Sequence, residues 1–553
     1  MKIIQFEKTP ERNKNLARER VKKEDYLGAL SILLSTEKPL YDTYAEIADV
    51  YADMGLLELS NEYWFKYIDC APKDKVAVAY EELAINYFYL ENLWASGYYF
   101  HQKISVDGFI SKEGLDQEII DFFSGEDYKK QAYRIAYPRE RADYTLELKR
   151  SKRALSLGGF EDAVTALSAI PIERRTEEIS GDLAISYIMC DKLDLAEEVC
   201  RDSIKRHGEN VTAYCNLSTI YDMKEDFENS DFYYQKALSF RTGDRAEWYK
   251  IATCSIERED HLTVIECLQN IIEERPYEVN MIFFLGQALA NVGDYQGAYN
   301  QLKKAYNIDR TDKVVKFYFD CIKDLLDDGV DKFLPFKYVK ELPEKQAKIN
   351  TKAIKELVKT PNKISSALKK QSVKDLVEWG ITQSETLRDS VFILATAFNS
   401  YSKNVVKNAL LKPELREETK RLMTYILMLK GVKEKIGLVV GNIYISVKPK
   451  RLQCEKQEDG FLYFNAYALC LSRVVFYEIE GYEQIAKVTD KIYKKLGGSV
   501  TESEATNEEI GALILSYCDF KRVSKENEIL RLFSVTKEKL HRLRNLYEGV
   551  KND

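Results

Sequence analysis

Apolar and small residues recur through the middle of this chain at a fixed interval of 34 residues. One column of positions holds a large aliphatic residue in four successive units, namely Leu183, Leu217, Ile251 and Leu285. The next position in each unit holds a small residue, namely Ala184, Ser218, Ala252 and Gly286. A constant period in this range is typical of stacked repeats, in which each unit covers the apolar side of its neighbour.

Each unit predicts two helices separated by a short turn. In residues 278–308, aliphatic residues keep the spacing of one helix face until Gly293-Asp294, and the same spacing resumes at Ala298 and Leu302. We expect Gly286 to let the two helices approach closely, because a larger side chain would stand between them. The unit is therefore a helical hairpin.

An N-terminal unit follows the same order of residue types: Tyr44, Ile47, Ala48, Tyr51, Gly55, Ser60, Trp64, Tyr67 and Pro72. This order resembles the tetratricopeptide repeat family across roughly residues 9 to 328. The resemblance implies an all-α fold, a right-handed α-solenoid of about eight helix pairs. It also implies that the first helices of the pairs line a concave face that binds a protein or peptide segment.

Changes in periodicity divide the chain into six segments. These are a first repeat block at 1–108, a connector helix and loop at 109–143, a second repeat block at 144–328, a lysine-rich connector at 329–385, a helical C-terminal domain at 386–500 and a tail at 501–553. In the C-terminal domain, β-branched runs on both sides of Gly441-Asn442 predict one small β-hairpin.

Candidate partner-binding residues lie on the predicted first helices of the second block. They are Asn216, Thr219, Tyr249, Lys250, Thr253, Phe284 and Gln287. Such a mixed aromatic and polar groove suits an extended or helical segment of a protein partner. A clamp for a C-terminal carboxylate fits less well, because Asp182 would repel it beside Asn216 and Lys250. The leading hypothesis is a non-enzymatic adaptor or scaffold.

The tail resembles a helix-turn-helix module of the DNA-binding kind. Its candidate DNA contacts are Thr536, Lys537, Lys539, Arg542 and Arg544. Residues 501–553 hold ten acids and nine bases, whereas nonspecific DNA affinity depends on an excess of positive charge. Two interpretations therefore remain, a transcriptional regulator that contacts DNA through this tail or a terminal packing module.

Lysines dominate the connector between the repeats and the C-terminal domain. Residues 332–374 hold twelve lysines and three acids. This segment could meet nucleic acid or another anionic partner. The alternative is a solvated helical connector that docks on the acidic repeats of its own chain, and arginines and aromatics interleaved with the lysines would favour nucleic acid more strongly.

Motifs for catalysis are missing from the sequence. It contains no P-loop, no glycine-rich dinucleotide loop, no H-E-x-x-H and no G-x-S-x-G. The ten cysteines and four histidines form no C-x-x-C or zinc spacing. We expect no enzyme, no cofactor and no metal. No apolar run reaches the roughly 18 residues of a membrane span, and the charged N-terminus predicts no signal peptide, so we expect a cytoplasmic protein without membrane insertion.

Overall fold

The computed structural model describes residues 10–36, 39–107, 144–156, 158–240, 244–329, 333–448, 461–474, 483–497, 499–501, 503–519 and 526–549. The predicted connector at 109–143 lies outside these residues. The chain forms two compact units. One is Ile135–Leu342, and the other combines Met1–Arg134 with Pro343–Asp553. The predicted segment boundaries stay a prediction.

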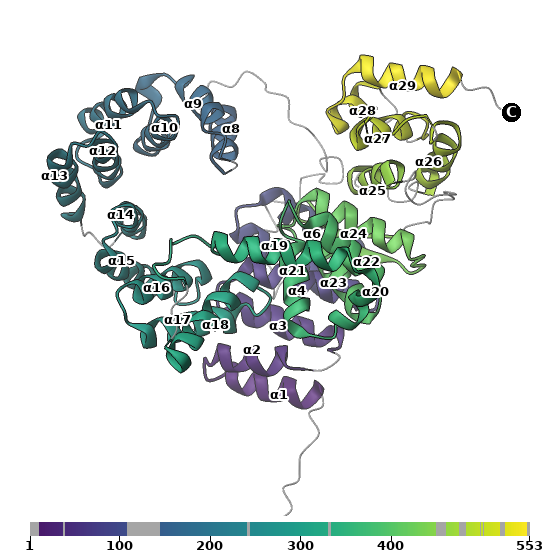
Figure 1. Ribbon diagram of the computed structural model, residues 1–553, viewed down its shortest axis with the longest axis horizontal. Coiled ribbons are helices and arrows are strands. Elements are labelled where there is room, and N and C mark those ends of the chain that lie inside the picture. Colours follow the sequence, from purple (N-terminus) through teal and green to yellow (C-terminus); the bar gives the residue numbers. More distant parts are fainter. Residues whose placement is uncertain are drawn as a thin grey trace, which may run out of the picture. The chain divides into compact units, whose positions relative to one another are not determined.

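The unit Ile135–Leu342 consists of helical hairpins that follow one another along the chain (Figure 1). Its helices are α8 (Thr145–Ser156), α9 (Phe160–Ser168), α10 (Glu177–Met189), α11 (Leu193–His207), α12 (Val211–Met223), α13 (Phe227–Leu238), α14 (Arg245–Glu257), α15 (His261–Glu274), α16 (Val279–Asn291), α17 (Tyr295–Ile308) and α18 (Lys313–Asp328), with a short 3₁₀ turn at Ile172–Arg174. We call α10, α12, α14 and α16 the inner helices, because they lie inside the curve that α11, α13 and α15 form outside (Figure 1).

The turns between paired helices repeat the same two devices. One is a residue with left-handed backbone at the same place in each unit: Asp191, Glu225, Glu259 and Gly293. The other is an aspartate that caps the second helix, since Asp226, Asp260 and Asp294 accept hydrogen bonds from backbone N–H groups three residues later at 3.2, 3.1 and 2.9 Å. The repeated turn fixes how each hairpin folds back on itself.

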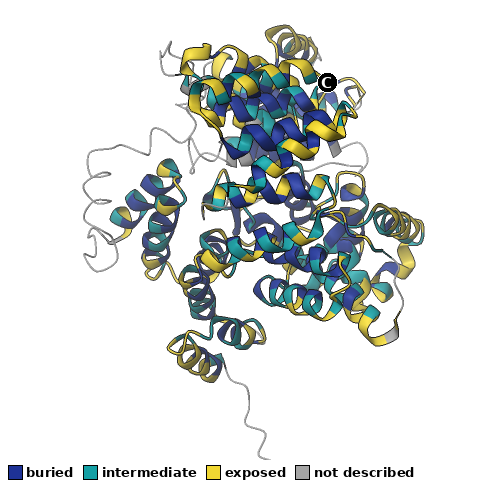
Figure 2. Cartoon of the chain, turned by 90° about the vertical axis from the view of Figure 1, so that its left-hand side faces the viewer, coloured by how far each residue is buried: buried dark blue, intermediate teal, exposed yellow. Residues whose placement is uncertain are grey.

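The core of this unit lies between the helices of each pair and between successive pairs. Leu217, Ile251 and Leu285 from the aliphatic column are all buried. A Cβ added at Gly286 would lie 2.7 Å from Cγ of Leu302, which confirms that this glycine allows the close approach of α16 and α17. Burial follows one side of most helices, as the dark and light sides in Figure 2 show.

The other unit begins with three helical hairpins. Its first six helices are α1 (Pro10–Val21), α2 (Tyr26–Leu34), α3 (Tyr41–Asp53), α4 (Leu57–Cys70), α5 (Val76–Tyr89) and α6 (Leu93–Asp107). Trp64, Tyr67 and Tyr51 from the N-terminal repeat pattern are buried between them. Together with the five pairs of the unit Ile135–Leu342, the described residues contain eight helix pairs.

The rest of this unit is also helical, with one β-hairpin. It comprises α19 (Glu344–Val358), α20 (Pro361–Ala367), α21 (Gln371–Gly380), α22 (Leu387–Thr396), α23 (Ser400–Leu411), α24 (Glu417–Leu429), β1 (Ile436–Val440), β2 (Ile443–Val447), α25 (Phe461–Val474), α26 (Glu483–Leu496), α27 (Asn507–Ser516), α28 (Glu526–Phe533) and α29 (Lys537–Gly549). The all-α fold class with one small hairpin is thus confirmed.

The hairpin has the register that its sequence predicts. Strands β1 and β2 pair antiparallel, with Val440 opposite Ile443. The two turn residues, Gly441 and Asn442, have φ of 53° and 69°. Positive φ at both central positions suits the twist of a two-residue hairpin.

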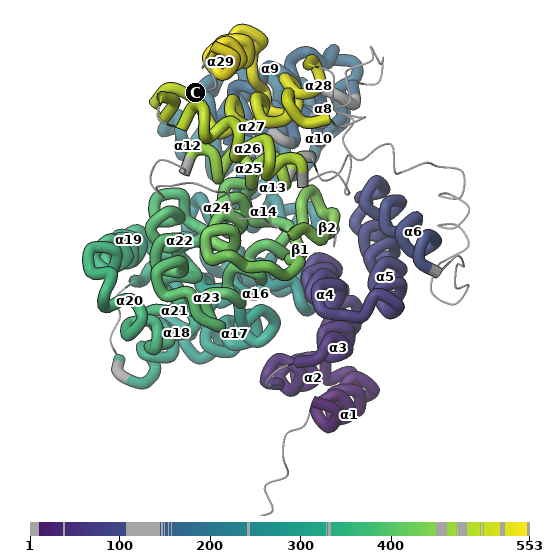
Figure 3. Tube along the Cα trace, turned by 90° about the vertical axis from the view of Figure 1, so that its right-hand side faces the viewer, coloured from purple at the N-terminus to yellow at the C-terminus, as the bar shows by residue number. Residues whose placement is uncertain are grey.

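This hairpin packs on the second helices of the N-terminal pairs, and Figure 3 shows β1 beside α4. The Tyr99 hydroxyl on α6 donates to the Asn442 carbonyl and accepts from the Tyr444 N–H, both at 2.8 Å. The Asp69 carboxylate on α4 accepts from the Gly437 N–H at 2.8 Å and lies 3.4 Å from the Lys407 Nζ on α23. The C-terminal part of the chain therefore covers one side of the first repeat block.

Candidate functional site

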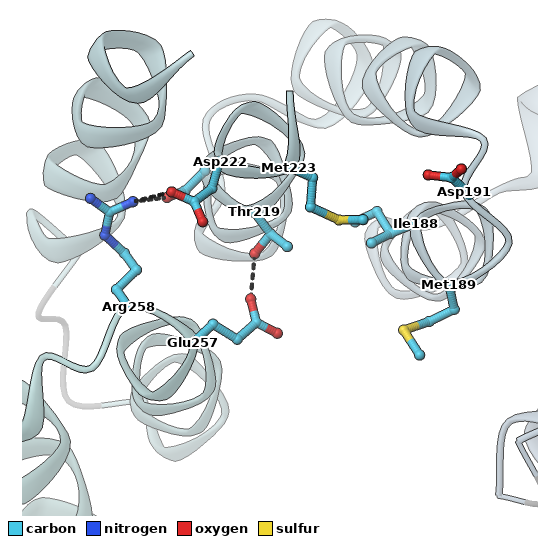
Figure 4. Close-up of a pocket in the computed structure, with 9 residues that line it drawn as sticks. Ile188, Met189, Asp191, Thr219, Asp222, Met223, Glu257 and Arg258 are labelled. Atoms are coloured by element: carbon cyan, nitrogen blue, oxygen red, sulfur yellow. Dashed lines mark hydrogen bonds and ion pairs between the residues drawn. The ribbon is translucent and has the colours of Figure 1, made fainter. Parts of the chain in front are cut away.

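The inner helices of the second block enclose an open pocket of about 440 Å³ (Figure 4). Three consecutive pairs contribute to its lining, which consists of Ile188, Met189, Asp191, Ser218, Thr219, Asp222, Met223, Glu257 and Arg258. The side chains of Met189 and Met223 are 57% and 48% exposed. Flexible thioether side chains such as these adapt to differently shaped apolar groups.

Carboxylates lie around the exposed methionines of the pocket. Asp222, Glu257 and Asp191 belong to three successive pairs, and the Thr219 hydroxyl donates to Glu257 at 2.6 Å. Arg258 is the only cation among the lining residues. Its guanidinium contacts Asp231 on α13 and lies 3.9 Å from Asp222, so a carboxylate outside the pocket already shares its charge. The pocket therefore favours a cationic or neutral guest over an anionic one.

A second part of the inner side is filled by the chain itself. Residues 334–341, which we call the inner strap, run without helix or strand past α16 and α18. Asn291 at the end of α16 holds the Phe336 backbone twice, because its amide donates to the Phe336 carbonyl at 2.9 Å and accepts from the Phe336 N–H at 2.7 Å. Gln287, one turn earlier, donates to the Val339 carbonyl at 3.5 Å.

Side chains of the strap alternate between buried and exposed from Phe336 to Val339, although the backbone turns at Tyr338, whose φ is 52°. Phe336 and Tyr338 are buried, whereas Lys337 and Val339 are exposed. The ring of Phe336 meets that of Tyr318 edge to face at 4.8 Å, and the Tyr338 hydroxyl lies 2.8 Å from Nδ1 of His261. An ion pair of 2.8 Å joins Lys340 to Asp312. The inner side thus binds a non-helical chain segment through both backbone and side chains.

The 34-residue period places the strap and the pocket on one track. Asn291, Glu257, Met223 and Met189 occupy the same position in four successive units. Gln287, Thr253 and Thr219 share another position, one turn earlier. The residues that hold the strap are therefore equivalent to residues at the pocket. We call this continuous track the inner groove.

The predicted partner-binding residues occupy different environments. Thr219 lies in the pocket, and Tyr249 and Thr253 are exposed on α14. Burial raises the pKa of the Asp182 carboxyl, and Lys250 on α14 offsets part of that rise. Asn216 and Gln287 are buried, and Asn216 donates to the Gly181 carbonyl at 3.4 Å.

Phe284 packs against the core of the block. The sequence prediction omits Met189, Met223, Asp191 and Glu257. Three of these four could be found from the sequence. Glu257, Met223 and Met189 stand in one column with Asn291, at intervals of 34 residues.

The family model for the tetratricopeptide repeat matches residues 211–242. That match spans the pair α12 and α13, which contributes four lining residues to the pocket. The chain contains a tetratricopeptide repeat at these residues. The resemblance that the spacing predicts is thereby confirmed.

Several solved structures are similar to this chain. The MamA protein is 17% identical over 34% of this chain and 98% of its own, with a TM-score of 0.22. A tetratricopeptide repeat protein from Parabacteroides merdae is 14% identical over 51% and 98%, with a TM-score of 0.28. Yeast Tom70 is 13% identical over 88% and 96%, with a TM-score of 0.28. No curated protein matches the chain.

In the tail, the four basic residues among the predicted DNA contacts lie beside acids or carbonyls. Lys537 and Arg544 lie 3.4 and 2.5 Å from Glu526, and Lys539 lies 2.7 Å from Glu509. Arg542 donates to the Glu504 carbonyl. Thr536 directly precedes α29. These contacts reduce the positive charge that α29 would offer to a phosphate backbone, and DNA binding stays a prediction.

Some lysines of the lysine-rich connector pair with acids of the same compact unit. Lys355 lies 2.6 Å from Glu385, and Lys348 lies 2.5 Å from Glu344. Lys340 in the strap pairs instead with a repeat helix, through Asp312 at the start of α18. Within the described ranges, no cluster of three or more His, Cys, Asp and Glu is arranged to hold a metal ion. None of the described helices is both long and apolar enough to span a bilayer.

Proposed function

We propose that this protein is a non-enzymatic adaptor that binds a segment of a partner protein in the inner groove of its second repeat block. The open pocket between α10, α12 and α14 carries the proposal, because three successive pairs present exposed methionines and polar groups toward one space. Buried, satisfied side chains would offer a partner little, whereas an open apolar floor with polar edges gives both area and specificity.

The surface that we assign to the partner extends beyond the pocket. It includes the exposed Tyr249 and Thr253 and the neighbouring Lys250 on α14. Its far end is the strap at α16, where the groove already holds a peptide backbone. A cytoplasmic setting belongs to the same proposal, since the described cysteines are thiols and not disulfides, which suits a reducing compartment.

Site-specific photo-crosslinking tests this proposal. A benzophenone amino acid replaces Met223 in the groove in one variant and Leu262 on α15 in the matched control, because Leu262 is 72% exposed on a second helix. Cells that express the full chain are irradiated, and adducts are identified by mass spectrometry, with and without nuclease treatment.

The proposal expects discrete protein adducts at position 223 that survive nuclease and are absent at position 262. Unfolding curves of both variants should match the parent, which shows that the fold is kept. Equal labelling at the two positions, or adducts only to nucleic acid, would refute the adaptor function.

A further inference from the structure

The inner groove shows how it holds a chain segment, because one such segment is already bound there. The strap has neither helix nor strand and turns at Tyr338, whose φ is 52°, and Asn291 recognises the Phe336 backbone by a paired donor and acceptor contact. Such a contact reads the backbone of an extended chain, whose N–H and carbonyl groups are not used within a helix. The same track continues, by the 34-residue period, to Glu257, Met223 and Met189.

Chemistry along the open part of the track differs from that beneath the strap. Where Asn291 offers an amide, the equivalent Glu257 offers a carboxylate, and Asp222 and Asp191 add two more at the pocket edge. Between them lie the exposed thioethers of Met189 and Met223. Arg258 balances little of this charge, since its guanidinium also faces Asp231 and Ser230.

Accordingly, we propose that the open part of the inner groove selects an extended partner segment in which a lysine or arginine stands next to a large apolar residue. The apolar side chain rests on Met189 and Met223, and the cation pairs with a carboxylate at the pocket edge, that of Glu257 or that of Asp191. The strap ends the groove at α16 and makes the partner bind on the side of α10 to α14. This inference rests on the proposed adaptor function and adds the chemistry of the partner.

The lysine-rich and aromatic composition of the strap supports this assignment. Its buried Phe336 and Tyr338 alternate with Lys337 and with Lys340, whose ammonium meets Asp312. The second block therefore already binds a segment in which a buried aromatic residue is followed by a lysine that pairs with an aspartate. Charge complementarity at the open pocket extends the same pattern to a partner from outside.

Selection from a random displayed peptide library tests the inference with no partner assumed. The full chain is the bait, and the double variant D191N/E257Q is compared with the matched control E198Q/E228Q, whose exposed carboxylates lie on α11 and α13. Selected peptides are then synthesised, and their binding is measured by fluorescence anisotropy at low and high salt.

We expect selected peptides to share a lysine or arginine beside Leu, Met or an aromatic residue. Their affinity should fall about tenfold in D191N/E257Q, which corresponds to about 1.4 kcal/mol, and should weaken with salt, while E198Q/E228Q binds like the parent. Circular dichroism of each variant verifies that the helices persist.

Three outcomes overturn the inference in distinguishable ways. Enriched peptides without a basic residue, or equal binding by D191N/E257Q, refute the charge selection but leave the adaptor function intact. A consensus with apolar residues three and four apart indicates a bound helix and refutes the extended mode. A library without any enriched peptide refutes both the inference and the adaptor function.

Discussion

The two repeat blocks share one helical hairpin pattern but leave different sides open. In the first block, the second helices α4 and α6 are covered by the C-terminal hairpin, through Asp69 and Tyr99. In the second block, the strap covers the α16 end of the inner side, and the pocket at α12 stays open. The repeats therefore form the surfaces, and segments outside the repeats determine which of these surfaces stays exposed.

The largest effect that separates the two blocks is expected at Tyr99. This side chain has no exposed surface, and its ring stacks on Tyr87 with centroids 5.8 Å apart. Replacing a buried aromatic residue with alanine typically costs about 3 to 5 kcal/mol. We expect Y99A to lower the free energy of unfolding by that amount in chemical denaturation, and to expose the amides of β1 and β2 to hydrogen exchange.

A conservative variant isolates the hydroxyl. Y99F keeps the ring but removes its bonds to the Asn442 carbonyl and the Tyr444 N–H, so its cost should be about 1 to 3 kcal/mol. Exchange in α12 and α13 of the other unit should stay unchanged in both variants. If β1 and β2 exchange at the parental rate in Y99A, the cover on the first block does not depend on this residue.

The next effect concerns Lys420, which fixes the hairpin to α24. Its buried Nζ donates to the Val439 carbonyl of β1 at 2.6 Å. Burial lowers the pKa of Lys420 from 10.5 to about 8. Between these two pH values the unfolded chain binds more protons than the folded chain, so stability rises with pH across this window.

The variant K420M lacks this titration. We therefore expect the free energy of unfolding of the parent to rise by about 3 kcal/mol relative to that of K420M as the pH rises from about 8 to about 10.5. Urea unfolding at a series of pH values measures this difference. Lys14 is the contrasting site, because it lies beside the carboxylates of Glu11 and Asp42. A K14M variant with the same pH trend would contradict the explanation.

Sequence reasoning succeeds where a local rule acts on neighbouring residues. The helix pairs, the close approach at Gly286 and the turn at Gly441-Asn442 all follow from spacing and backbone preference within a few residues. The contact between Asp69 and Gly437 joins residues far apart in sequence, and no periodic pattern predicts it.

The candidate site shows the same limit. The sequence predicts Thr219 on the inner side because its helix face can be counted. It predicts Gln287 there as well, yet the environment of Gln287 depends on the strap, which follows α18. A segment without periodicity, Leu334 to Glu341, thus determines which residues of a periodic groove remain available. Recognising it from sequence would require knowing that Phe336 meets Asn291.

The smallest expected effect tests whether the strap is held by its backbone, as the proposed mode of partner binding assumes. N291A removes both bonds to Phe336, at a cost of about 1 to 2 kcal/mol. Hydrogen exchange of residues 334–341 should accelerate, whereas N270A, whose amide bonds the Glu266 carbonyl of its own helix, should leave the strap unchanged. Burial of the Phe336 ring contributes about 1.5 to 3 kcal/mol by itself. Parental exchange of the strap in N291A would therefore mean that ring burial holds it. The groove would then read side chains rather than an extended backbone, and a helical partner would fit it as well as an extended one.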